Sequence, residues 1–295
     1  MPRRIIAVLL LLLLPLSLLS CDRQKDDGPY AATPPARVAV LFSSLCEVWQ
    51  AVGGTVAITV GESVERGLVP SGTPLVDTGA GKTINTELLL AERPDLVIYS
   101  PDIPAQAEAA ALCRGAGIRT LALRLDAFSD YMDAIKEAAA ITGDPDAVAA
   151  AEAMSVQIET VKAGVPKEGK TVLFVRAGST QSSTKAKRST DHFAAAMLTE
   201  LGCRNIADGT PLLVDTLSTE AILAADPDHI FFSMMGNEDA ARANITAMLE
   251  RPEWQAMRAV RQGNVTLLPR ELFHFKPCGR YVRAYRFLAD TLYGE

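Results

Sequence analysis

The chain has 295 residues, a formal net charge of −6 and five cysteines. A mildly acidic chain lacks the excess of Lys and Arg that binding to nucleic acid requires, which argues against nucleic acid as a partner. The length allows one large domain or two domains of ordinary size.

The first 35 residues have the pattern of an exported protein with a lipid anchor. Arg3 and Arg4 precede an apolar run at 5–19, which is too short to span a bilayer as a helix. The stretch "LLSC" that ends at Cys21 resembles the bacterial lipobox, in which the cysteine is acylated and becomes the new N-terminus. We therefore expect a signal peptide at 1–20, lipidation at Cys21 and a flexible polar tether at 21–35. The protein would lie outside the cytoplasm, in the periplasm or on the outer cell surface, anchored to the membrane.

After the tether, short runs rich in Val, Ile and Leu alternate with Ala-rich helical patterns. The runs "RVAVLF" at 37–42 and "DLVIYS" at 95–100 are typical of parallel strands that are buried on both faces. The same alternation starts again at 170–179 with "KTVLFVRAGS". The sequence thus predicts an α/β fold with two lobes of similar construction, at 36–143 and at 166–295.

Between the two lobes, residues 144–165 have the signals of one long helix. Asp144 suits the N-cap, Pro145 suits the first turn, and Gly164 and Pro166 end the pattern. At 1.5 Å per residue, such a helix is about 30 Å long, which is the width of a small domain. A single stiff helix is therefore expected to join the lobes and to allow only modest rocking.

A sixteen-residue segment occurs twice, as "NTELLLAERPDLVIYS" at 85–100 and as "STEAILAADPDHIFFS" at 218–233. Each copy starts with a residue that can cap a helix and carries a glutamate two positions later, Glu87 or Glu220. Negative charge in the first turn is favoured by the helix dipole, so the two glutamates can be simple helix-start residues. Their repetition also allows a shared role, one in each lobe.

In an open α/β sheet, ligands bind beyond the carboxyl ends of the strands, so the loops that follow the strands are the candidates for a cleft between the lobes. In the first lobe the expected ligand-binding residues are Phe42, Ser43, Ser44, Trp49, Asp77 and Ser100. In the second lobe they are Arg176, Ser179, Lys185, Lys187, Arg188, Met234, Met235, His274, Lys276, Arg280 and Tyr281. The basic residues of this second set predict an electropositive wall, unless the loop at 179–191 is only a solvated surface segment.

The histidines and cysteines do not form a metal-site pattern, and no metal site is predicted. Sites for bare zinc or manganese use several converging His and carboxylate ligands, whereas only His192 and His274 are available here. Ligation of haem by His274, Tyr281 or Met234 stays open. The cysteines after Cys21 favour buried free thiols, although their even number permits disulfides; they are Cys46, Cys113, Cys203 and Cys278.

From Arg37 to Tyr293, the chain resembles the class III solute-binding lipoproteins of ABC importers, which serve vitamin B12, haem and ferric siderophores. The resemblance rests on the two "PD" segments of the repeat and on the ending "LFHFKPCGRYVRAYRFLADTLYG" at 272–294. It implies two Rossmann-like lobes joined by one long helix, with the ligand in the cleft between them. It also implies that an ABC permease dimer with its ATPase is the partner, and that Glu87 and Glu220 dock on the permease.

We therefore expect a monomeric binding protein rather than an enzyme, with a metal chelate as ligand and no cofactor. The sequence contains no GxSxG, GxxxxGK[ST], HExxH or GxGxxG motif. The predicted basic wall favours an anionic ferric siderophore. Corrinoid (cobalamin) and haem are the alternatives within the family, and a chelatase-like enzyme or a bare-metal binding protein are those outside it.

Overall fold

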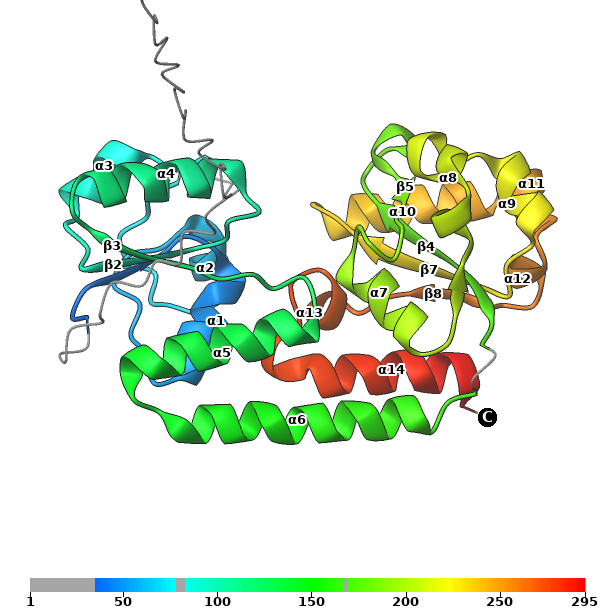
Figure 1. The fold of residues 1–295 in the computed structure, drawn as a ribbon. Helices are drawn as coiled ribbons and strands as arrows, with labels where there is room; N and C mark the ends of the chain where they lie inside the picture. The colour runs from blue at the N-terminus through cyan, green and yellow to red at the C-terminus, as the bar shows by residue number, and fades with distance from the viewer. Residues whose placement is uncertain (1–34, 78–82, 167–168, 295) are drawn as a thin grey trace, which may run out of the picture.

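The computed structural model describes residues 35–77, 83–166 and 169–294 (Figure 1). The predicted signal peptide, the lipidation site at Cys21 and nearly all of the predicted tether lie outside these residues. Within the described ranges, no helix combines the length and the apolar character needed to cross a membrane.

The first lobe is built on parallel strands that are buried on both faces. Its strands are β1 (Val38–Val40), β2 (Leu96–Tyr99) and β3 (Arg119–Ala122), which pair in the order β1-β2-β3. Its helices are α1 (Ser43–Ala51), α2 (Gly61–Glu65), α3 (Thr86–Ala91), α4 (Pro104–Gly115) and α5 (Phe128–Thr142). Because helices cover both faces of the sheet, the strands read as continuous apolar runs rather than as alternating ones (Figure 1).

The second lobe repeats this plan with a larger sheet. Its strands are β4 (Thr171–Ala177), β5 (Lys185–Ala186), β6 (Arg204–Asn205), β7 (His229–Met234) and β8 (Val265–Leu267). They pair in the order β5-β4-β7-β8, with β6 beside the start of β4, and only β5 is antiparallel to its neighbour. Its helices are α7 (Phe193–Glu200), α8 (Pro211–Thr216), α9 (Thr219–Ala225), α10 (Glu238–Leu249), α11 (Pro252–Gln255) and α12 (Arg258–Arg261), with short 3-10 turns at Gln181–Ser183 and Ile206–Gly209.

One long helix, α6 (Pro145–Ala163), connects the two lobes. The Asp144 side chain caps it by accepting hydrogen bonds from the backbone N–H groups of Asp146 and Ala147. In Figure 1, α6 runs beneath both lobes and packs against α5 and α14 (Tyr281–Tyr293), which lie directly above it in this view. The predicted two-lobe α/β fold with a single long connecting helix is confirmed.

The chain also crosses between the lobes a second time, which the sequence did not predict. After β8, the chain forms α13 (Arg270–Phe273) and the 3-10 turn η3 (Cys278–Arg280), and it returns as α14. The Cys278 thiol donates a hydrogen bond to Ser44 O in the first lobe at 3.5 Å. At the other end of α14, the Tyr293 hydroxyl donates to Leu201 O in the second lobe at 3.0 Å. We call residues 273–280 the crossing segment.

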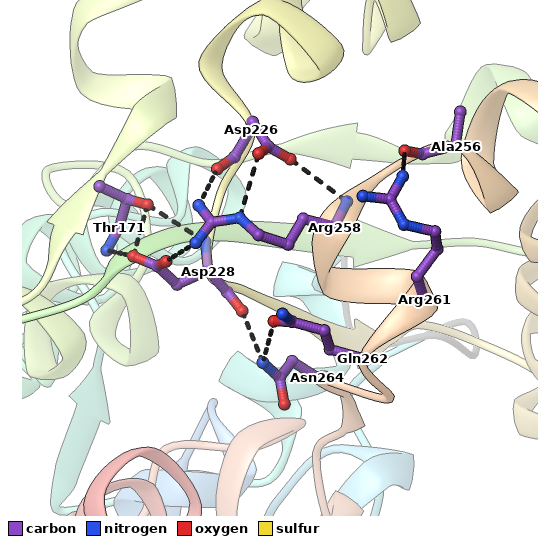
Figure 2. Close-up of polar contacts among 8 residues, drawn as sticks. All are labelled: Thr171, Asp226, Asp228, Ala256, Arg258, Arg261, Gln262 and Asn264. Carbon is purple, nitrogen blue, oxygen red and sulfur yellow. Dashed lines mark hydrogen bonds and ion pairs between the residues drawn. The ribbon is translucent and has the colours of Figure 1, made fainter.

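The two copies of the sequence repeat adopt the same local structure. Asn85 caps α3, and Ser218 caps α9, each by accepting a hydrogen bond from a backbone N–H one turn ahead. Each helix then leads into a buried central strand, β2 or β7. Figure 2 shows how the second copy is fastened: Arg258 forms ion pairs with Asp226, at the end of α9, and with Asp228, at the start of β7.

The four described cysteines are free and buried. Burial raises the pKa of each thiol above its usual value, so all four stay protonated at neutral pH. They behave as small packed side chains rather than as reactive groups.

Candidate ligand cleft

A cavity of about 370 Å³ lies between the two lobes, within the size range of small-molecule sites. The first lobe contributes Phe42, Glu62 and Asp126 to its lining, and the crossing segment contributes His274, Phe275 and Lys276. The second lobe contributes Arg176 and residues of the stretch from Ser189 to Ala196 at the start of α7. A ligand in this cavity would therefore touch both lobes and the segment that joins them.

Arg176 reaches the cavity from the carboxyl end of β4. It lies on the same face of the strand as Val172 and Phe174, which are packed in the core, so the strand period directs its side chain toward the cleft. Burial lowers the pKa of its guanidinium. Among the described residues, no side chain or carbonyl pairs with this guanidinium by an ion pair or a hydrogen bond. A half-buried cation without a partner is costly, and an anionic ligand group would relieve that cost.

His192 lines the same cavity. Its Nδ1 accepts a hydrogen bond from Ala194 N at 3.2 Å and so caps α7, which assigns the ring proton to Nε2. The imidazole packs against Phe174 and Phe193, with ring centroids 4.7 Å and 4.6 Å away. Burial, together with the charges of nearby basic residues, lowers the pKa of His192 well below its usual value. The ring is therefore neutral, and its Nε2–H can donate to a ligand.

His274 has the opposite tautomer. Its Nδ1 lies 2.8 Å from Met234 O, and because a carbonyl oxygen can only accept, Nδ1 carries the proton. Burial lowers the pKa of His274 as well, so the ring is neutral at pH 7. Its Nε2 keeps a lone pair that can accept a hydrogen bond or bind a metal, and the Met234 carbonyl holds the ring in the orientation that such ligands need.

Carboxylates in the cavity lining make the electropositive region smaller than the sequence predicted. Lys276 is paired with Asp126 at 2.8 Å, and Glu62 accepts a hydrogen bond from Ser43. Asp191 adds a third carboxylate to the lining. Positive charge without a carboxylate partner is thus concentrated at Arg176 rather than spread along the wall.

The loop at 179–188 lies on its own lobe instead of covering the cavity. Lys185 Nζ donates to Asp215 O at 3.2 Å, at the end of α8. The Asn244 side chain donates to Gly178 O and to Thr184 Oγ1 and so fastens the start of the loop to α10. Only the stretch after this loop reaches the cleft. Lys185, Lys187 and Arg188 are therefore not part of the cavity lining, and the predicted electropositive wall does not include them.

Of the residues expected from sequence, Phe42, Arg176, His274 and Lys276 line the cavity. Trp49 is buried in the first lobe, where its Nε1 donates to Thr55 O at 3.1 Å, and Tyr281 is buried beside Phe128. Arg280 lines a neighbouring groove, where it is paired with Glu47 at 2.8 Å. The remaining expected residues also lie outside the lining; they are Ser43, Ser44, Asp77, Ser100, Ser179, Lys185, Lys187, Arg188, Met234 and Met235.

Several lining residues were not expected from the sequence. Asp126 follows the apolar run that ends at Leu125, so the rule of looking beyond strand ends applies to it. Glu62 follows the apolar stretch at 56–60, which joins the first-lobe sheet only through isolated bridges. His192 and Phe193 mark the start of α7, and the sequence shows no signal for their direction.

Glu87 and Glu220 are exposed in the first turns of α3 and α9. Figure 1 shows both helices on the side of the sheets that faces away from α6. In the described part of the chain, neither carboxylate forms an ion pair or a side-chain hydrogen bond. Their proposed docking role stays a prediction.

Two α/β lobes, one long connecting helix and a polar cavity between the lobes form the architecture of a two-lobed binding protein. The sequence profile of the periplasmic binding proteins matches residues 38–272, and the chain belongs to this family. Among curated proteins, none matches the sequence.

Solved structures of three binding proteins share this fold. The vitamin B12 binding protein BtuF of Vibrio cholerae has a TM-score of 0.71 and 18% identity, over 88% of this chain and 97% of that one. The siderophore binding protein BauB, bound to acinetobactin and ferric iron, has a TM-score of 0.72 and 16% identity, over 89% and 94%. The haem-binding protein BhuT, in complex with two haems, has a TM-score of 0.66 and 26% identity, over 87% and 98%.

The family and these similarities confirm the expected class, a class III substrate-binding protein of the ABC importer type. Proteins of this class work outside the cytoplasm together with an ABC permease and its ATPase. The names of these similar proteins give chemically different ligands, so the ligand of this chain has to be argued from its own cleft.

Proposed function

We propose that the protein captures an anionic iron chelate in the cleft between its lobes and delivers it to an ABC permease. The observation that carries this proposal is the guanidinium of Arg176 in the cavity lining, which has no ion-pair or hydrogen-bond partner among the described residues. A guanidinium binds a carboxylate, catecholate or phosphate with two parallel hydrogen bonds. His192 belongs to the same lining, and its ring proton on Nε2 would supply a further donor for the ligand.

A ferric siderophore suits this cavity best. Phe42, Phe193 and Phe275 offer apolar surface to the body of a chelate, while Arg176 faces its negative charge. The cavity volume of about 370 Å³ is near the small end of the range for ligand sites. That size favours a compact chelate over a corrinoid, whose macrocycle carries a nucleotide loop.

Haem is the second candidate, and the Nε2 lone pair of His274 favours it. A siderophore that occupies all six positions on the iron leaves none for a protein ligand. Haem leaves its axial positions open to a histidine whose other ring nitrogen donates to a carbonyl, as His274 does.

Absorption spectra and affinities of two variants separate these candidates. Replacing Arg176 by Gln should weaken binding of every anionic chelate, whereas replacing His274 by Ala should shift the Soret band only if the iron is ligated by His274. Native mass spectrometry of the protein from iron-limited cells would identify a retained ligand. A wild-type protein that binds neither ferric chelates nor haem would contradict the proposal.

The proposal extends to the parts that lie around the cleft. We propose that 36–143 and 166–295 are the two domains joined by 144–165, that the protein works as a monomer, and that an acylated Cys21 holds it at the membrane. Glu87 and Glu220 would meet basic residues of the permease. Their exposure and their lack of partners within the described residues support this role.

A further inference from the structure

The crossing segment changes its attachment from one lobe to the other at Phe275. On the preceding side, Phe273 O accepts a hydrogen bond from Ser233 Oγ at 3.1 Å, and His274 donates to Met234 O. Both partners belong to β7 of the second lobe. The backbone up to His274 is therefore held by the second lobe.

On the following side, the ion pairs are made with the first lobe, while Lys276 Nζ also lies 5.2 Å from the ring centroid of Phe193 in the second lobe. Lys276 pairs with Asp126 at 2.8 Å, and Arg280 pairs with Glu47 at 2.8 Å. Phe275 lies between these two sets of contacts. Its position is consequently determined by both lobes at once.

Phe275 belongs to the lining of two hollows. One is the cleft cavity and the other is a groove of about 550 Å³, and these two linings have no other residue in common. The guanidinium carbon of Arg66, from the first lobe, lies 4.0 Å from the ring centroid, and that of Arg270, from the second lobe, lies 5.4 Å away. Cation–π contacts from both lobes thus hold the ring in place.

We propose that Phe275 is a specificity-determining residue that limits the size of the chelate. With the ring in place, a ligand is confined to the cleft cavity. Without it, the cavity and the groove become continuous, and a bulkier anionic chelate can extend into the groove. This inference rests on the proposed function, because it concerns the same ligand site.

The test compares F275A with F42A, since Phe42 lines the same cavity but not the groove. Both variants lose one aromatic ring from the cleft, but only F275A removes the ring that lines both the cleft cavity and the groove. Equilibrium dialysis with radioactive iron measures the affinity for a compact probe, ferric dicitrate, and for a bulky tris-catecholate probe, ferric enterobactin. F275W, which keeps a large ring at this position, and thermal unfolding of every variant control for the fold.

We expect F275A to bind ferric enterobactin roughly tenfold more tightly than wild type, and F42A and F275W to show no such gain. Equal gains in F275A and F42A, or none in a folded F275A, would overturn the role of Phe275 while the proposed function stands. If wild type and all variants bind neither probe, the proposed function is contradicted and this inference with it.

Discussion

Asp228 and Thr171 form a reciprocal pair that joins the two central strands of the second lobe. The backbone N–H of Thr171 donates to Asp228 Oδ2 at 2.7 Å, and the backbone N–H of Asp228 donates to Thr171 O at 2.8 Å. Asp95 and Arg37 make the same pair in the first lobe, at 2.8 Å in both directions. The aspartate of each repeat copy is therefore explained by folding, whereas Glu87 and Glu220 have no such partners in the described residues.

The Asp228 pair predicts an effect on stability. Replacing Asp228 by Asn removes a charge that accepts hydrogen bonds from Thr171 and pairs with Arg258 (Figure 2). We expect the free energy of unfolding to fall by about 1–2 kcal/mol, measured by urea unfolding. D226N, which weakens an ion pair of Arg258 without touching the strand, should cost less, and a larger loss in D226N than in D228N would contradict the argument.

The same carboxylate predicts a pH dependence. Burial acts to raise the pKa of Asp228, but the hydrogen bonds from Thr171 and the charge of Arg258 outweigh burial and hold it below its usual value. A lowered pKa in the folded state contributes stability above the unfolded value near about 4, and this contribution is lost as the pH falls through the folded value. The difference in unfolding free energy between wild type and D228N should therefore narrow below about pH 4. A difference that stays constant as the pH falls well below that value would show that the charge is not responsible.

Arg176 predicts opposite effects on binding and on stability. The R176Q variant should bind an anionic chelate about tenfold to a hundredfold more weakly, since a hydrogen bond to a charged group contributes about 1.5–3 kcal/mol. The ligand-free variant should unfold at the same or a higher temperature, because the substitution removes a half-buried charge that has no partner in the described part of the chain. Titration calorimetry and thermal scans test both effects. K185Q, whose side chain contacts α8, is the control and should bind like wild type.

The two exposed glutamates predict a defect in transport without a defect in binding. In E87K and E220K, the affinity for the ligand should equal that of wild type, and uptake in a reconstituted importer should fall sharply. The loss of one partner of a desolvated charge pair typically costs about 2–5 kcal/mol, so each single change should already be measurable. E152K places the same reversal on the exposed side of α6 and should transport normally. Unchanged uptake in the double variant would refute docking through these residues.

The ion pairs of Glu47 should contribute to the free energy of unfolding, because they join the first lobe to the crossing segment. Its carboxylate is paired with Arg66 and with Arg280, and its side chain is 13% exposed. In E47A, both guanidinium groups lose their partner, and we expect a loss of about 3 kcal/mol in unfolding free energy. E65A removes an exposed glutamate from the same groove and should cost less than about 0.5 kcal/mol.

Because two connections between the lobes limit their rocking, X-ray scattering should show only a small change when the wild-type protein binds its ligand.

Much of the fold follows from local pattern. Apolar runs such as Val38 to Val40 and His229 to Met234 identify buried parallel strands, and Asp144, Pro145 and Gly164 mark the ends of the connecting helix within two residues. These features depend on the spacing of apolar residues along the chain and on helix capping, and both are determined by residues that are close in sequence. The repeat at 85–100 and 218–233 likewise indicates two equivalent helix–strand units from the order of the residues alone.

The cleft depended on the tertiary structure. Arg176 in β4 and Lys185 in β5 are both basic and lie opposite each other in register, yet only Arg176 lines the cavity, whereas Lys185 donates to Asp215 O in α8. This difference depends on where the long side chains find contacts in the folded protein, which the local sequence does not encode. The pairing of Arg280 with Glu47 joins residues 233 positions apart, and no local pattern encodes it. The sequence by itself determined the class of protein and its two lobes. Only the packing of distant segments decided which side chains meet at the ligand site, because that site is built from loops and one crossing segment whose positions are set by long-range contacts.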